Sequence, residues 1–313
     1  MGSLLKLDNL PLGDIEWMLS HAMGTKNYSP SSNQKMKGKH LAPLFFQESS
    51  RTYMNSTTAF MRLGGTLLPM NIENTRLNET WSEPIRDFCV LLNNCCDYAV
   101  IRSADVGVVE EFASWLDIPI INAGNGYGKG SEHPVQALND ITTIRSAFGK
   151  RAVKVLMIGG KHVRTMRTLV KLLLRMGHTV DLIVSDKQLD IDNSDMDDIY
   201  DSHVNYHSDL QSCDLSQYDV IYHTGADEDQ SVENDKRFII NRKLLEESNF
   251  KGKVMHGLPR LSELTFDVDD TSHNLYFEQM RRLPEMYTAV FHYISGEKKV
   301  SALNSKRSNV ALV

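Results

Sequence analysis

The stretch "LAPLFFQESSRTYMNSTTAFMRLGGTLLPM", residues 41–70, decides the fold class. It begins with an apolar segment typical of a strand and continues through a polar loop at residues 48–52. Apolar residues at helical spacing then follow over residues 54–63, and Gly64 and Gly65 end that helix. A second apolar segment comes directly afterwards, so we expect the order strand, loop, helix, strand.

The same alternation continues along the chain. Strands are expected at "YAVIRS", "IPIINAG", "VKVLMIGG", "TVDLIVSD", "DVIYHTG" and "KVMHGLP". Helices are expected at residues 8–23, 83–94, 108–116, 133–149, 164–176 and 284–295. The segment "VKVLMIGG" is continuously apolar, as a parallel core strand should be. This pattern predicts an α/β fold of doubly wound parallel sheets.

A chain of 313 residues is long enough for two domains. We expect a first domain over residues 1–145, joined by the C-terminal helix region 284–313, and a second domain over residues 146–283. Two such domains would leave an interdomain cleft, where α/β folds commonly bind ligands.

Composition excludes several classes of protein. The net charge of −6 gives no sign of the basic surface that nucleic-acid binding requires. No apolar run reaches the length of a membrane span. The N-terminal segment lacks the basic start and apolar stretch of a signal peptide. We therefore expect a cytoplasmic protein with neither nucleic acid nor a membrane as a partner.

Metals and cofactors are not expected. Cys89, Cys95, Cys96 and Cys213 show no CxxC spacing, so we interpret them as buried free thiols rather than metal ligands. The glycines of "MIGGKHVRT" lack the GxGxxG spacing of nicotinamide-binding proteins and predict only a tight turn near a ligand.

The loop before the first predicted helix of the opening stretch has the composition of an anion site. A helix start exposes unpaired backbone N–H groups and the positive end of the helix dipole. Ser49, Ser50 and Thr52 add hydroxyl donors, and Arg51 adds a planar guanidinium that suits phosphate oxygens. The alternative is an ordinary helix cap beside one exposed arginine, and these residues alone leave both readings open.

Polar residues recur at other predicted strand ends and helix starts. Arg102 ends the strand "YAVIRS", His133 opens a helix with Gln136 one turn later, and His256 follows another strand. Because open α/β sheets bind ligands at the carboxyl ends of their strands, these positions favour a binding site over a purely structural role.

Three of these segments, "FFQESSRT", "EHPVQALNDITTI" and "MHGLPR", resemble the signature segments of the aspartate and ornithine carbamoyltransferases. "INAGNGYG" and "DVDDTSHNLYFEQM" are more similar to the aspartate branch. The resemblance implies an N-terminal carbamoyl phosphate domain and a C-terminal amino-acid domain. It also implies a homotrimer whose active sites are shared between subunits, and it implies no metal.

The resemblance also implies a role for each matching residue. Thr52, Arg102 and His133 would face the carbamoyl oxygen, and Gln136 would accept from the carbamoyl NH2; these four are the expected catalytic residues. The full set implied for carbamoyl phosphate is Ser49, Ser50, Arg51, Thr52, Arg102, His133, Gln136 and Leu258. On the acceptor side the set is Arg164, which would hold an α-carboxylate, with Leu258, Pro259 and Asp227.

The chain departs from the family pattern in three segments. Leu77, beside Arg76, stands where the family supplies a lysine from the neighbouring subunit. Gly225 and Asp227 stand where the aspartate branch carries an arginine and a glutamine, and Gly257 replaces a proline. Retained Arg164 with loss of that arginine suggests an acceptor with one carboxylate. An acidic replacement such as Asp227 would suit an acceptor with an additional amine, such as 2,3-diaminopropionate. A solvated loop with no bearing on the substrate is the alternative.

The leading hypothesis is therefore a carbamoyltransferase whose amino-acid acceptor is not plain aspartate. An aspartate carbamoyltransferase of pyrimidine synthesis is the first alternative. A catalytically weak paralogue that binds phosphate or assembles with a partner is the second, and Leu77 favours it.

Overall fold

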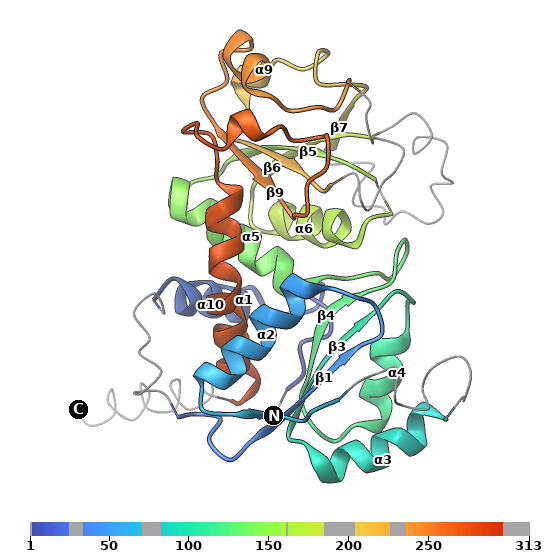
Figure 1. Cartoon of the computed structure of the whole chain (residues 1–313). Helices are drawn as coiled ribbons and strands as arrows, with labels where there is room; N and C mark the ends of the chain where they lie inside the picture. The colour runs from blue at the N-terminus through green and yellow to red at the C-terminus, as the bar shows by residue number, and fades with distance from the viewer. Residues whose placement is uncertain are drawn as a thin grey trace, which may run out of the picture. The chain divides into compact units, whose positions relative to one another are not determined.

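The computed structural model describes residues 2–24, 34–70, 83–160, 162–184, 204–225 and 236–296 (Figure 1). The chain forms two compact units: unit 1 comprises Met1–Gly126, Glu132–Leu138 and Leu283–Val313, and unit 2 comprises Tyr127–Ser131 and Asn139–Arg282. It passes from unit 1 to unit 2 within α5 (Pro134–Phe148) and returns within α10 (Tyr276–Ile294). The sequence suggested divisions after residues 145 and 283.

Unit 1 is built on a parallel sheet of four strands in the order β2-β1-β3-β4. The strands are β1 (His40–Phe45), β2 (Thr66–Leu67), β3 (Tyr98–Ser103) and β4 (Ile120–Asn125). The chain moves outward in one direction from β1 to β2 and in the other from β3 to β4. The point where the direction reverses therefore lies between β1 and β3, whose ends are paired at Phe45 and Arg102.

Helices cover both faces of this sheet (Figure 1). The helices that lie wholly in unit 1 are α1 (Leu12–Gly24), α2 (Ser50–Arg62), α3 (Ile85–Cys95) and α4 (Val108–Trp115). On one face, Phe88 of α3 and Phe112 of α4 share an apolar core with Ile101 of β3. On the other face the rings of Phe60, Tyr98 and Phe291 pack together, which joins α2 and α10 to β3.

Unit 2 contains a parallel sheet of five strands in the order β7-β6-β5-β8-β9. These are β5 (Lys154–Ile158), β6 (Thr179–Ile183), β7 (Val204–His207), β8 (Val220–His223) and β9 (Lys253–His256). The direction of winding reverses between β5 and β8, so the loops after these two strands flank the switch point of unit 2.

The sheet of unit 2 is also buried on both faces. The remaining helical elements are α6 (Arg164–Arg175), α9 (Arg242–Glu247) and the short 3-10 helices η4 (Leu215–Gln217) and η5 (Phe266–Val268). Ile221 of β8 packs with Leu245 of α9 and Val268 of η5 on one face. On the opposite face Tyr222 donates a hydrogen bond to Asp140 of α5 (3.0 Å). The expected fold class, two doubly wound parallel-sheet α/β domains, is confirmed.

Three helix starts were predicted wrongly. α1 begins at Leu12 rather than at residue 8, and α2 begins at Ser50 rather than at residue 54 because Ser49 already caps it. α10 begins at Tyr276 and carries Pro284 in its interior, although the proline had suggested a start at residue 284. Asn274 accepts from Phe277 N (3.3 Å) ahead of the first turn, and the buried apolar face of the helix offsets the backbone hydrogen bond that the proline lacks.

The cysteines match their prediction only in part. All four are free thiols, and Cys89 and Cys96 are buried, but Cys95 is exposed because it lies at the last position of α3. Burial raises the pKa of the Cys89 thiol to about 11 and that of Cys96 to about 12. Among the described helices, none combines the length and apolar character needed to cross a membrane.

Candidate active site

The start of α2 lies at the switch point of unit 1. Ser49 is the N-cap residue: its hydroxyl oxygen accepts from Thr52 N (3.4 Å), and the hydroxyl also donates to Thr52 Oγ1 (2.9 Å). The first turn of α2 contains no acidic residue, so the positive end of its dipole is not neutralised by its own side chains. Ser50 is exposed and Arg51 is half-buried on this turn, and the turn is therefore suited to an anion.

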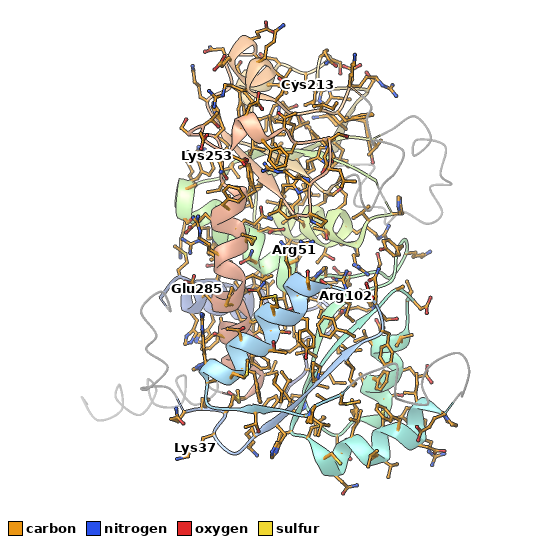
Figure 2. The ribbon with its side chains drawn as sticks, in the orientation of Figure 1. Lys37, Arg51, Arg102, Cys213, Lys253 and Glu285 are labelled. Carbon is orange, nitrogen blue, oxygen red and sulfur yellow. The ribbon has the colours of Figure 1, made fainter. Side chains whose placement is uncertain are left out.

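Arg102 is brought beside this turn by the register of the sheet. It pairs with Phe45 across the parallel strands, and its carbonyl accepts from Phe46 N (2.9 Å) just before the α2 loop. Its side chain is buried, and Nη1 donates to Ala123 O (3.2 Å). Figure 2 shows Arg51 at the start of α2 and Arg102 at the end of β3.

His133 reaches the same part of unit 1 from the loop after β4. Arg102 Nη1 lies 3.5 Å from His133 Nε2, at the outer limit of a hydrogen bond. His133 is buried and lies immediately before α5. The residue before it is fixed in place, because Glu132 N donates a hydrogen bond to Asn125 Oδ1 (2.9 Å). Gln136 follows one turn later and is half-buried.

Two arginine side chains carry positive charge in this region. The Arg51 guanidinium is half-buried and the Arg102 guanidinium is buried, and the starts of α2 and α5 belong to the same region. The positive charge of Arg102 also acts on the Tyr287 hydroxyl. Burial raises the pKa of the Tyr287 hydroxyl, and Arg102 opposes part of that shift. The predicted catalytic residues Thr52, Arg102, His133 and Gln136 thus all come from segments at the carboxyl edge of one sheet.

The switch point of unit 2 is tightly packed. Gly159 follows β5 with φ +144°, and a side chain there would place Cβ 1.9 Å from Thr224 Oγ1, after β8. Thr224 N donates to Ile158 O (2.9 Å), which closes the two loops against each other. The glycine turn predicted from "MIGGKHVRT" therefore exists because the backbone of one loop must approach the side chain of the next.

Arg164 begins α6 beside this turn and is fully buried. Its guanidinium carbon lies 5.0 Å from the centre of the Tyr127 ring, which is a cation–π contact. Tyr127 is held there by its own loop, because Gly128 N donates to His162 O (2.8 Å). Tyr127 was not predicted as a site residue, and only its place in the glycine-rich "NGYGKG" pointed to an unusual loop.

The loop after β9 is fixed by hydrogen bonds to His256. Leu258 N donates to His256 Nδ1 (2.8 Å), and Leu258 adopts a left-handed backbone with φ 49°. His256 Nε2 pairs with Glu263 Oε1 (2.8 Å), and both side chains are buried. Burial by itself would raise the pKa of Glu263, but the hydrogen bond from His256, a backbone hydrogen bond and the nearby histidines together outweigh burial and lower the pKa to about 2. The carbonyls of Leu258 and Pro259 therefore sit on a rigidly held turn.

His223, His256 and Glu263 place one ligand atom each within 4.8 Å of one another, which is the spacing of a metal site. The protonation of the two histidine rings does not suit a metal site. The Nδ1 atoms of His223 and His256 accept from Gly225 N (3.1 Å) and Leu258 N (2.8 Å), so the proton of each neutral ring is on Nε2. A metal ligand must offer a lone pair, and these two Nε2 atoms do not.

Three predicted or discussed residues lie outside the described part of the chain: Asp227 for the acceptor, and Arg76 and Leu77 for the shared site. Gly225 is described, with φ +102°, and a Cβ there would lie 3.4 Å from His256 Cε1. Sequence reasoning did not single out Tyr127, Arg167, His223 or Glu263, because their importance depends on burial and on contacts between distant segments.

Both units match family models. Residues 3–146 match the aspartate/ornithine carbamoyltransferase carbamoyl-P binding domain, and residues 151–294 match the Asp/Orn binding domain of the same family. The chain belongs to the aspartate/ornithine carbamoyltransferase family. The expected enzyme class, a carbamoyltransferase, is thereby confirmed.

Individual relatives lie in the aspartate branch. The aspartate carbamoyltransferase catalytic subunit of Methanobrevibacter smithii is 31% identical over 290 residues, which cover 88% of this chain and 89% of that protein. The aspartate transcarbamoylase of Trypanosoma cruzi in complex with carbamoyl phosphate aligns with a TM-score of 0.80 at 28% identity, over 93% of this chain and 95% of that one. Its complex with carbamoyl phosphate and aspartate aligns with a TM-score of 0.79 at the same identity and coverage.

These comparisons bear on the choice of acceptor. The archaeal relative and the two solved structures described above are named for aspartate. They therefore favour the aspartate alternative over the altered acceptor that Gly225 and Asp227 had suggested.

Proposed function

We propose that this carbamoyltransferase moves the carbamoyl group of carbamoyl phosphate to the α-amine of aspartate. The amine nitrogen bonds to the carbamoyl carbon, the bond from that carbon to the phosphate oxygen breaks, and the amine loses a proton. The observation that carries the proposal is the convergence, in unit 1, of the α2 start, Arg102 and His133 at one switch point.

In this proposal unit 1 binds carbamoyl phosphate. The start of α2, the Ser49 and Ser50 hydroxyls and the Arg51 guanidinium hold the phosphate. Thr52, Arg102 and His133 then stabilise the negative charge that develops on the carbamoyl oxygen, and Gln136 accepts from the carbamoyl NH2. Catalysis is mainly positioning and electrostatic stabilisation, because these groups are fixed by the sheet before the substrate arrives.

Unit 2 binds the acceptor. Arg164 holds the α-carboxylate through paired N–H donors, while the carbonyls of Leu258 and Pro259 accept from the amine and orient its lone pair. An acceptor other than aspartate is the second candidate. The specific observation that favours it is Gly225, which offers no side-chain donor for a second carboxylate.

The test is the release of inorganic phosphate from carbamoyl phosphate across a panel of amines: aspartate, 2,3-diaminopropionate, ornithine and neutral amino acids. A blank without enzyme corrects for spontaneous hydrolysis, and mass spectrometry identifies the carbamoylated product. We expect the highest kcat/KM with aspartate. Arg51→Ala should weaken carbamoyl phosphate binding by about 1.5–3 kcal/mol, the scale of a charge-assisted hydrogen bond.

The other outcomes are distinct. A better kcat/KM with diaminopropionate or a neutral amino acid would replace the aspartate proposal with the altered acceptor. Phosphate release at the blank rate with every amine would favour the weak paralogue. Unchanged carbamoyl phosphate affinity in folded Arg51→Ala would remove the phosphate role of the α2 start.

A further inference from the structure

Tyr287 of α10 has a buried hydroxyl group that makes no hydrogen bond to any described residue. The exposed fraction of this residue is 0%. A buried tyrosine hydroxyl usually has a partner, because a polar group that leaves water without one loses its hydration and gains nothing in return. The position of this hydroxyl in the fold therefore needs an explanation.

The packing of unit 1 places Tyr287 and Arg102 on the same face of the sheet. Tyr287 and Phe291 are four residues apart in α10, so their side chains start on one face of the helix. The Phe291 ring packs against Tyr98 of β3, with 6.3 Å between the ring centres. Tyr98 and Arg102 are four residues apart in β3 and therefore project from the face of the sheet that α10 covers.

The charge of Arg102 acts on the Tyr287 hydroxyl. Burial raises the pKa of Tyr287 above its ordinary value, and Arg102 opposes part of that rise, so the guanidinium lies within electrostatic reach of the phenol oxygen. The raised pKa keeps the hydroxyl neutral at physiological pH. A guanidinium can only donate hydrogen bonds, so the bond that would join these two groups runs from Arg102 to the Tyr287 oxygen.

We propose that Tyr287 is a positioning residue for carbamoyl transfer, whose hydroxyl oxygen accepts a hydrogen bond from the Arg102 guanidinium when carbamoyl phosphate is bound. This rests on the proposed function, in which Arg102 stabilises the negative charge on the carbamoyl oxygen. Arg102 Nη1 lies 3.5 Å from His133 Nε2, at the outer limit of a hydrogen bond, and catalytic hydrogen bonds of this kind tighten in the substrate complex. The bond to Tyr287 would hold the guanidinium in that tighter arrangement.

The experiment compares two probes by calorimetry. Phosphonoacetamide carries a carbamoyl group beside a phosphonate and cannot transfer it, whereas inorganic phosphate has no carbamoyl group. Tyr287→Phe should weaken phosphonoacetamide binding by about 3–10-fold, the scale of one hydrogen bond, and change phosphate binding by less than about 2-fold. The midpoint of urea unfolding should not fall, because the hydroxyl that is removed has no partner in the structure.

Tyr293→Phe, in the same helix, is the matched control with the opposite expectation. The Tyr293 hydroxyl donates to Asp14 Oδ2 of α1 (2.6 Å), so its removal should lower the unfolding midpoint and leave the affinity for both probes unchanged. A double-mutant cycle tests whether Tyr287 acts through Arg102. In the Arg102→Gln background, Tyr287→Phe should cause no further loss of phosphonoacetamide affinity.

Equal phosphonoacetamide affinities of the wild type and Tyr287→Phe would overturn the proposal. Equal losses for both probes, an undiminished loss in the Arg102→Gln background, or failure of Tyr287→Phe to fold would also overturn it, because each indicates a structural role. Binding needs no turnover, so a selective loss supports the proposal even if transfer to aspartate fails. Transfer to aspartate at the same rate in both proteins would leave the proposed function intact and contradict only the role of Tyr287.

Discussion

At the scale of single residues, Gly159 shows that the loops at the switch point of unit 2 leave no room for a side chain. Its φ of +144° suits glycine, and any side chain would meet Thr224 Oγ1 at 1.9 Å. The contact joins the ends of β5 and β8, which flank the switch point. A larger residue would separate these loops and shift the start of α6, where Arg164 lies.

His223 makes stability depend on pH. It is completely buried, and its Nε2 has no hydrogen-bond partner. Burial, with a smaller contribution from the neighbouring His256, lowers the pKa of His223 to about 3, and Glu263 opposes part of that shift. Unfolded histidine titrates near 6.5, so the unfolded state binds more protons between pH 6.5 and 3. Stability is therefore full above pH 6.5 and declines as the pH falls through this window.

We expect the free energy of unfolding to fall by about 2 kcal/mol between pH 7 and pH 5 through His223 alone. Asparagine in His223→Asn can still accept from Gly225 N but does not titrate, so it should lose this part of the pH dependence. Urea unfolding of both proteins at several pH values measures the difference. Glu263 contributes little to the change in stability between pH 7 and pH 5, because its pKa rises from about 2 in the folded protein only to about 4.5 on unfolding. Parallel curves for the two proteins would show that His223 does not titrate on unfolding.

At the scale of elements, the start of α2 combines a helix cap with the proposed phosphate site. Ser49 satisfies Thr52 N by accepting a hydrogen bond from it. The extended backbone of Ser49, with φ −165°, turns the chain from the loop after β1 into the helix. The element that the sequence suggested as a phosphate cradle is thus also an N-capped helix, so the two readings of Ser-Ser-Arg-Thr are compatible.

Ser49→Ala should destabilise the protein by about 0.5–2 kcal/mol, because it removes the oxygen that accepts from Thr52 N. Ser50→Ala is the matched control: Ser50 is the next residue and is exposed, so its change should stay within about 0.5 kcal/mol. Chemical denaturation without ligands gives both values. Similar losses at the two positions would mean that the Ser49 cap does not stabilise α2.

At the scale of the whole molecule, the family resemblance predicts a homotrimer with shared active sites. Sedimentation velocity or mass photometry should give a particle of three times the chain mass at micromolar concentration. Adding carbamoyl phosphate should not change that mass, because the trimer would exist before substrate binds. A stable monomer would contradict the prediction and would also remove the expected role of the segment around Leu77.

The sequence by itself determined the order of most strands and helices, because apolar periodicity and glycine positions act locally, but it missed β7 and α9. It also pointed to residues 49–52 as the proposed anion-binding turn, since the composition of a helix start is a local property. The first residue of a helix was harder to predict from the sequence. Pro284 suggested a helix start, yet α10 begins at Tyr276 and continues past this proline because the helix is packed in the core. Only the tertiary structure brought Arg102 to His133 across 31 positions, set Tyr127 over Arg164, and buried Arg167 and His223. These features depend on strand register and on burial, which join residues that no local pattern relates.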